Sequence, residues 1–257
     1  MIRGIIFDYD GTIAQTLEIQ ERWLRFWSQE NKKVWPFQNY NEFRDFYNRE
    51  ADIGNFPQVY RALELPYGDE RDHPVWAAYN HFRRENPPQL YPGIRECLHQ
   101  LFEWGNLSDD PRNNTRVKIG LNTTNTWKSV GHQLRTFGLL GYFDSKITEE
   151  VLREAGGGNP TKLYKPSTAS TVMLLNLLGT KGSETVHVGD TLSDLLCAHQ
   201  VTRKEGESPE NLVTIGVTYG FEGRKVLERG AETPRGKIYF DHLVDHPEEI
   251  FPLLKSL

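Results

Sequence analysis

The sequence predicts an α/β fold, in which an open parallel sheet carries helices on both faces and is interrupted by one helical insert. Short apolar segments typical of buried strands alternate with longer segments of helical periodicity through most of the 257 residues. Such alternation favours parallel strands joined by right-handed helical connections. The composition, with 37% hydrophobic and 25% charged residues, is that of an ordinary globular chain.

Four segments have the character of buried parallel strands, and a fifth would add an edge strand. The four are Gly4 to Phe7, Val117 to Thr123, Thr185 to Val188 and Leu212 to Val217, and the fifth is Lys237 to Phe240. Helical patterns lie between them, at Gly93 to Trp104, Lys128 to Phe137, Ser167 to Leu178 and Ser193 to His199. Because such sheets bind ligands at the carboxyl ends of their strands, the residues that follow each strand are the candidates for chemistry.

The stretch from 16 to 90 breaks this alternation, because it contains no convincing strand. Apolar residues recur there at helical spacing. They are Ile19, Trp23 and Phe26 or Trp27, followed by Phe43, Phe46 and Tyr47. We interpret them as the core of a helical domain rather than as a ligand site. The expected organisation is a discontinuous α/β core, residues 1–15 and 91–257, with an inserted helical domain, residues 16–90.

Charge and cysteine content limit the possible partners. The formal net charge is -5, so no basic excess would draw the chain to nucleic acid or to an anionic membrane. Cys97 and Cys197 are far apart in helical segments, which suits reduced thiols and a cytoplasmic setting. The N-terminal apolar run is too short for a secretory signal, and no window has the length of a membrane span. We therefore expect a soluble protein that holds any anionic substrate by a local site.

Two carboxylates follow the first strand, in the stretch FDYDGT. Asp8 and Asp10 point the same way by strand alternation, while Gly11 and Thr12 turn the chain away. Like charges that close repel each other, so the pair indicates a metal site, an acid/base pair, or both. The alternative is an Asx-turn that caps a helix.

A second acidic cluster, VHVGDTLSD, follows the strand that contains Val186 and Val188. In a parallel sheet, Asp190 would reach the same rim as Asp8 and Asp10, and the three could converge on one hard cation. Asp194 is better placed to hold Asp190 or to cap its helix than to bind a metal.

Two other segments supply the groups that a negative substrate would need. The stretch LNTTN, residues 121–125, brings hydroxyl and amide groups to the mouth of a helix, which is a natural anion position. The stretch YKPS, residues 164–167, places Lys165 before Pro166 at the first turn of another helix.

In this order, FDYDGT, LNTTN, YKP and VGDTLSD, the chain resembles the haloacid dehalogenase (HAD) superfamily in its phosphatase branch. The resemblance covers the whole chain outside the insert. YPGIRECLHQL, residues 91–101, resembles the segment that re-enters the core after the cap in phosphoglycolate-phosphatase-like members. The resemblance to the superfamily implies a Rossmann-like core. It also implies that the insert is a helical cap domain, because phosphoglycolate-phosphatase-like members carry their cap directly after the first motif.

The resemblance also implies roles for the site residues. Asp8 would be the nucleophile, Asp10 the general acid and base, and Lys165 the group that neutralises charge on the nucleophile and the phosphate. Asp8, Asp190 and the backbone carbonyl of Asp10 would hold Mg²⁺, with Asp194 behind them.

The phosphate contacts implied by the resemblance come from the first two motifs. Thr124 and Asn125 would bind the phosphoryl oxygens, and Gly11 would line the same position. Thr123 competes with Thr124, because the doubled threonine leaves the strand end ambiguous by one residue.

The implied activity is magnesium-dependent hydrolysis of a small phosphorylated metabolite through an aspartyl phosphate, as in phosphoglycolate phosphatases. True dehalogenases have the pattern D-x-Y-G-T in the first motif, with no acid two residues after the nucleophile. This chain has Asp10 at that position. The alternatives are a β-phosphoglucomutase-like mutase and a silent binding or scaffold protein of the same fold.

Specificity would come from the cap. The candidates are Arg44, Arg49, Asn55, Arg83 and Arg84. Arg49 is our first choice, because it precedes a loop with Gly54, where an arginine could bind a carboxylate or a second phosphate. The alternative for each of them is a solvated surface position.

Overall fold

The computed structural model describes residues 1–50, 56–68, 73–104, 116–202 and 208–257. The chain divides into two compact units. The first contains Met1–Ala14 and Leu90–Leu257, and the second contains Gln15–Gln89. No helix in the described ranges combines the length and the apolar character needed to cross a bilayer.

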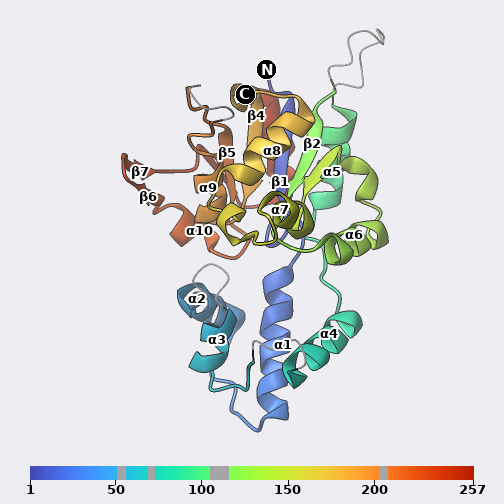
Figure 1. Cartoon of the computed structure of the whole chain (residues 1–257), viewed down its shortest axis with the longest axis vertical. Coiled ribbons are helices and arrows are strands. Elements are labelled where there is room, and N and C mark those ends of the chain that lie inside the picture. Colours follow the sequence, from blue (N-terminus) through green and yellow to red (C-terminus); the bar gives the residue numbers. More distant parts are fainter. Residues whose placement is uncertain (51–55, 69–72, 105–115, 203–207) are drawn as a thin grey trace. The chain divides into compact units, whose positions relative to one another are not determined.

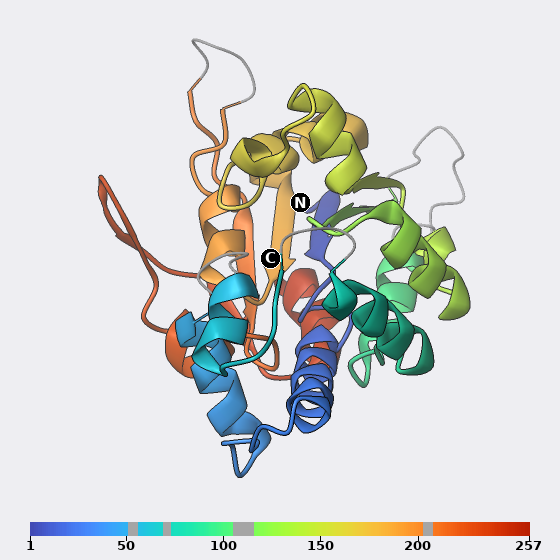
Figure 2. The same ribbon diagram turned by 60° about the horizontal axis from the view of Figure 1, so that its bottom comes forward.

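The first unit is built on a parallel sheet with the strand order β3-β2-β1-β4-β5-β8. Its strands are β1 (Gly4–Asp8), β2 (Lys118–Asn122), β3 (Ser145–Ile147), β4 (Thr185–Gly189), β5 (Val213–Val217) and β8 (His242–Val244). Figures 1 and 2 both show the blue β1 beside β4, which is its hydrogen-bonded neighbour. Both strands are buried along their whole length, as their apolar sequences predict.

Helices cover both faces of this sheet. They are α5 (Ile94–Glu103), α6 (Trp127–Thr136), α7 (Glu149–Ala155), α8 (Ala169–Leu178), α9 (Leu192–Ala198), α10 (Gly223–Leu227) and α11 (Ile250–Ser256). Alternate residues of β1 enter different hydrophobic clusters. Phe7 packs in a cluster with Ile94 of α5, whereas Ile6 packs in a cluster with Leu174 of α8. The predicted fold class is confirmed.

The predicted edge strand at Lys237 to Phe240 is wrong. The strand there, β7 (Gly236–Ile238), pairs antiparallel with β6 (Ala231–Thr233) in a separate two-stranded sheet. Gly236, at φ +114, follows Pro234 and Arg235 in a tight turn that folds the chain back on itself. The edges of the main sheet are β3 and β8 instead, each only three residues long.

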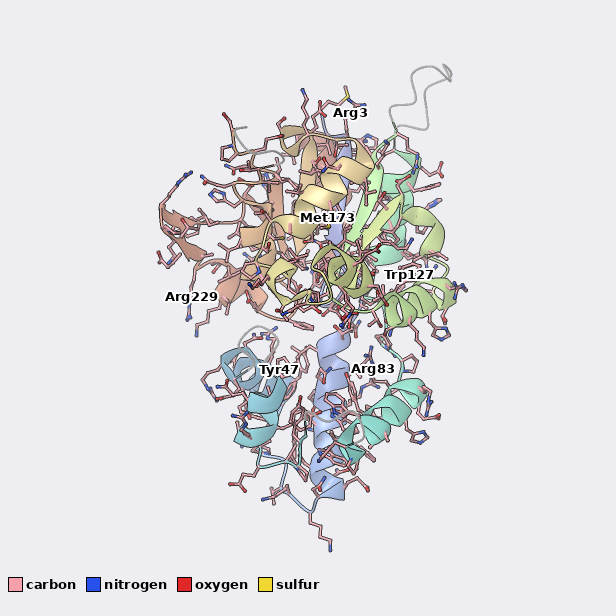
Figure 3. All side chains as sticks on the ribbon, viewed as in Figure 1. Arg3, Tyr47, Arg83, Trp127, Met173 and Arg229 are labelled. Carbon is pink, nitrogen blue, oxygen red and sulfur yellow. The ribbon has the colours of Figure 1, made fainter. Side chains whose placement is uncertain are left out.

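The second unit contains α1 (Thr16–Glu30), α2 (Tyr40–Glu50), α3 (Phe56–Ala62) and α4 (Pro74–Glu85), and no strand occurs among its described residues. Trp23 is fully buried, and its indole nitrogen donates to the Tyr60 hydroxyl at 2.6 Å. Its ring stacks on Trp27 at 5.3 Å between centroids and meets Tyr79 edge-on. Figure 3 labels two other side chains of this unit, Tyr47 on α2 and Arg83 on α4. Of the residues predicted to form the core of this unit, Ile19, Trp23, Phe43, Phe46 and Tyr47 are buried, whereas Phe26 is 37% exposed.

Candidate active site

The first unit brings the end of β1 against the segment that follows β4. Asp8 is the last residue of β1 and only 6% exposed. The chain then turns at Gly11, where φ is +76. A Cβ at this position would lie 2.0 Å from Oδ2 of Asp190, so only glycine allows this close approach.

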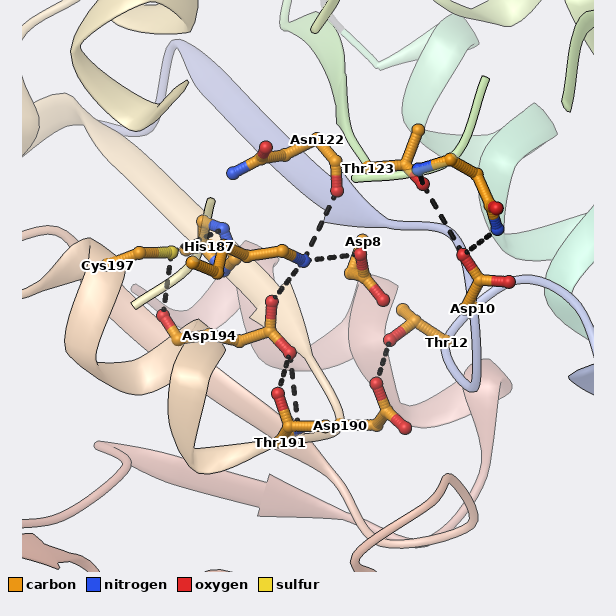
Figure 4. A network of polar contacts seen from close by, with 12 residues as sticks. Asp8, Asp10, Thr12, Asn122, Thr123, His187, Asp190, Thr191, Asp194 and Cys197 are labelled. Carbon is orange, nitrogen blue, oxygen red and sulfur yellow. Dashed lines mark hydrogen bonds and ion pairs between the residues drawn. The ribbon is translucent and has the colours of Figure 1, made fainter. Parts of the chain in front are cut away.

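Asp8, Asp190 and Asp194 form a buried carboxylate cluster. One oxygen from each lies within 4.8 Å of the others. Asp190 is held by two donors, the Thr12 hydroxyl at 3.2 Å and the backbone N–H of Phe221 at 2.7 Å. Figure 4 shows these acids approaching from separate segments of the chain. Oxygen ligands in this arrangement suit a hard cation such as Mg²⁺.

Lys165 links two of the three carboxylates. Its ammonium donates to Asp8, to Oδ1 of Asp194 at 2.7 Å and to the backbone carbonyl of Asn122 at 3.3 Å. The side chain is only 10% exposed. The sequence placed Lys165 and Asp8 in one site but did not pair Lys165 with Asp194.

Asp194 caps its own helix. Its Oδ2 accepts from the backbone N–H of Thr191 at 3.1 Å and from the Thr191 hydroxyl at 2.7 Å, in a capping box that begins α9. Its other oxygen holds Lys165. Asp194 was expected either to cap its helix or to hold Asp190. It caps the helix, and its hydrogen bonds go to Lys165 and Thr191 rather than to Asp190.

Burial and mutual repulsion dominate the electrostatics of this cluster. Burial raises the pKa of Asp8 to about 8, against the opposing charge of Lys165. Burial, together with Asp8 and Asp194, also raises the pKa of Asp190 well above its ordinary value. Although burial opposes it, Asp194 and Asp8 raise the pKa of Lys165. The cluster holds three carboxylates and one ammonium, so further positive charge is needed to balance the carboxylates when they are ionised. The residues therefore fit a divalent cation.

The end of β2 faces Asp10 through Thr123, not Thr124. The Thr123 hydroxyl donates to Oδ2 of Asp10 at 3.4 Å and accepts from the Asn125 backbone N–H at 3.1 Å. The Asn125 amide donates to the same Asp10 oxygen at 2.7 Å. Thr123 is fully buried and Thr124 is exposed. The cause is the strand end, since β2 stops at Asn122, one residue before the predicted end.

The cap candidates lie in the second unit and are described there alone. Arg49 is 66% exposed, and its Nε donates to Glu50 at 2.9 Å, so a neighbouring acid already offsets its charge. The Arg83 guanidinium lies over the Tyr79 ring, and Arg84 is exposed. Arg44 has a buried Nε without a hydrogen-bond partner. Asn55 and Gly54 lie outside the described residues.

The two donors to Asp190 were not predicted from the sequence. The sequence indicated only that Thr12 turns the chain, whereas its hydroxyl also donates to Asp190. Phe221 reaches Asp190 because Gly220 allows a close approach, since a Cβ on Gly220 would lie 2.3 Å from the Cβ of Asp190. The stretch TYGF after β5 is the signal that could have found this contact. His187 lies in β4 and is fully buried, and this burial lowers its pKa to about 4.

The chain is similar to known proteins along most of its sequence. The sequence model of the haloacid dehalogenase-like hydrolase family matches residues 2–202. The probable phosphatase IndB of Dickeya dadantii (strain 3937) is 26% identical over 84% of this chain and 81% of that protein. A phosphoglycolate phosphatase of Yersinia pseudotuberculosis is 28% identical, but the match spans 53% of this chain and 47% of that protein.

Solved structures share the fold. The crystal structure of a predicted phosphoglycolate phosphatase from Haemophilus somnus superposes with a TM-score of 0.65, at 17% identity and with 98% of each chain covered. At that identity the likeness speaks for the fold alone. It extends over the whole chain, including the helical unit.

Proposed function

We propose that this chain, which belongs to the haloacid dehalogenase-like hydrolase family, is a phosphatase that hydrolyses a small phosphomonoester through an aspartyl phosphate on Asp8. The observation that carries the proposal is the buried contact of Lys165 with Asp8 and Asp194, next to Asp190. A phosphate dianion resists attack by a carboxylate, so a site for this reaction must supply positive charge and hold the nucleophile in line.

In the first step, an oxygen of Asp8 attacks phosphorus, and the bond between phosphorus and the ester oxygen breaks. Asp10 gives its proton to the leaving alkoxide. In the second step, Asp10 takes a proton from water, which attacks the phosphorus of the aspartyl phosphate and frees the Asp8 carboxylate. Asn125 and Thr123 orient Asp10 for both transfers through their hydrogen bonds to its Oδ2.

The side chains of Asp8 and Asp190 and the backbone carbonyl of Asp10 would hold Mg²⁺, with Asp194 fixing Lys165 beside them. The ion would offset carboxylate charge and polarise the phosphoryl oxygens. Gly11 remains a proposed neighbour of the bound phosphate. The cytoplasmic setting and the identity of the metabolite stay predictions.

The first test is phosphate release from p-nitrophenyl phosphate with and without metal. We expect hydrolysis in Mg²⁺, loss to background in EDTA because the carboxylates repel the phosphate, and recovery when Mg²⁺ is restored. Full activity in EDTA would contradict the proposed metal. No phosphate release from any phosphomonoester would favour the scaffold alternative. Conversion of a sugar phosphate to its isomer with a bisphosphate activator would favour the mutase.

A second test compares the doubled threonines. Because the buried Thr123 hydroxyl faces Asp10, we expect Thr123→Ala to lower kcat/KM for p-nitrophenyl phosphate roughly 10- to 100-fold, the effect of one hydrogen bond to a charged group. The matched Thr124→Ala variant removes an exposed hydroxyl and should change kcat/KM less than about threefold. A larger loss of kcat/KM in Thr124→Ala than in Thr123→Ala would instead favour Thr124 as the phosphate-binding residue.

A further inference from the structure

The segment that follows β5, residues 219–222, contacts both parts of the first unit that carry the clustered carboxylates. The Tyr219 hydroxyl donates to the backbone carbonyl of Thr12 at 3.1 Å, in the turn that follows β1. The Phe221 backbone N–H donates to Asp190 at 2.7 Å, in the loop that follows β4. This segment thus joins the turn after β1 to the loop after β4.

Glu222 is the last residue of this segment and holds the same loop a second time. Its Oε2 accepts from the backbone N–H of Leu192 at 2.7 Å. Leu192 is the first residue of α9 and lies two residues after Asp190. A backbone N–H in the first turn of a helix has no acceptor within the helix, so the Glu222 carboxylate satisfies it. The loop is therefore held at the Asp190 side chain and again at the backbone of Leu192.

The backbone of the segment is packed directly against both carboxylate-bearing parts. A Cβ on Gly220 would lie 2.3 Å from the Cβ of Asp190 and 2.5 Å from the carbonyl oxygen of Gly11. A Cβ on Gly11 would lie 2.8 Å from Cδ1 of the Phe221 ring. Because there is so little free space, a shift of the loop after β4 has to displace the 219–222 segment as well.

The contact of Glu222 with Leu192 does not depend on the charge of the carboxyl group. Burial raises the pKa of Glu222 to about 7, against the effect of the Leu192 N–H, and the charge of Asp194 adds to the rise. Both the neutral and the ionised carboxyl are therefore populated at neutral pH. Each form keeps an oxygen that accepts a hydrogen bond, so the loop is held in either case.

We infer that Glu222 is a positioning residue of the proposed metal site, which acts through Leu192 to fix Asp190 beside Asp8 before a cation binds. This inference rests on the proposed phosphatase function and its Mg²⁺ site. Removal of a group that orients a metal ligand typically lowers metal affinity by about 10- to 100-fold. Loss of the Glu222 acceptor should therefore weaken metal binding, although Glu222 is not itself a proposed ligand.

The test measures cation binding by the full chain in the absence of substrate. Mn²⁺ is the probe, because it takes the same oxygen ligands as Mg²⁺ and the electron paramagnetic resonance signal of free Mn²⁺ is lost on binding. We expect Glu222→Ala to raise the Mn²⁺ dissociation constant at least about tenfold. Glu222→Gln should stay within about threefold of wild type, because its amide oxygen still accepts from the Leu192 N–H.

Glu150→Ala is the matched control. Glu150 also accepts from a backbone N–H at the start of a helix, that of Trp127 in α6, but α6 carries none of the clustered carboxylates. This variant should keep the Mn²⁺ dissociation constant within about threefold of wild type. Thermal unfolding without metal verifies that each variant folds, and Glu222→Leu carries the same test if Glu222→Ala does not fold.

Unchanged Mn²⁺ affinity in a folded Glu222→Ala variant would overturn the inference. An equal loss of affinity in Glu222→Gln would also overturn it, because charge rather than the hydrogen bond would then be responsible.

The Mg²⁺ dependence of p-nitrophenyl phosphate hydrolysis provides a second measurement. Glu222→Ala should need at least about tenfold more Mg²⁺ for its half-maximal rate and should recover most of the wild-type kcat when Mg²⁺ is saturating. A low kcat with an unchanged Mg²⁺ requirement would contradict the role of Glu222 while leaving the phosphatase function intact. Failure of the wild-type chain to hydrolyse any phosphomonoester would instead overturn the phosphatase function.

Discussion

Asp8→Asn is expected to abolish turnover of every phosphomonoester, with kcat reduced at least about 10³-fold. The amide carries no charge with which to attack phosphorus, and it offers the Lys165 ammonium a neutral acceptor in place of a charged one. Steady-state release of p-nitrophenol, in Mg²⁺ and at saturating substrate, measures the effect.

The control for Asp8→Asn is Asp45→Asn, which makes the same chemical change at an exposed position of α2 and should retain wild-type kcat. Thermal unfolding separates loss of chemistry from loss of fold. We expect the variant to fold, because Lys165 can keep its contact with Asp194. Full activity in a folded Asp8→Asn variant would end the assignment of Asp8 as nucleophile.

In the Asp10→Asn variant we expect the aspartyl phosphate to form quickly and to be hydrolysed slowly. The p-nitrophenolate leaving group departs without needing a proton, so the first step should proceed, whereas the second step loses the base that activates water. We expect a burst of about one p-nitrophenol per active site, followed by steady-state turnover roughly 10²- to 10⁴-fold below wild type. Rapid-mixing absorbance measurements resolve the two phases.

The asparagine at position 10 can still accept the hydrogen bond from Asn125 through its amide oxygen, so the local geometry should be retained. An alkyl phosphate provides the control substrate, because its poorer leaving group needs the acid and should show no burst in this variant. Steady-state turnover close to wild type with p-nitrophenyl phosphate would contradict the role of Asp10 as the base.

The strands that form the middle of the sheet could be predicted because each is a short, mainly apolar segment followed by turn residues. β1, β2, β4 and β5 are all of this kind. β3 and β8 were missed because three residues are too few to show a periodic pattern. The apolar segment in β7 was misplaced because local pattern does not reveal the strand with which it pairs.

The carboxylate cluster could be predicted for a related reason. Parallel strands deliver the residues that follow them to one edge of the sheet, so the meeting of Asp8 with Asp190 follows from topology. The partners of Asp194 do not follow from topology. Lys165 reaches Asp194 from the loop before α8, and this contact depends on the side-chain conformation of Lys165. The choice of Thr123 over Thr124 depended on a strand boundary, and a boundary error of one residue reverses which side chain faces the site.

The most direct test of the account is the location of the phosphoryl group in the Asp10→Asn variant, quenched in acid during the burst and digested for peptide mass spectrometry. The account predicts one added phosphoryl group on the peptide that contains Asp8, removable by hydroxylamine as expected of an acyl phosphate, and no such peptide in Asp8→Asn. A phosphoryl group on another peptide, or a full burst of p-nitrophenol without any phosphorylated peptide, would contradict it.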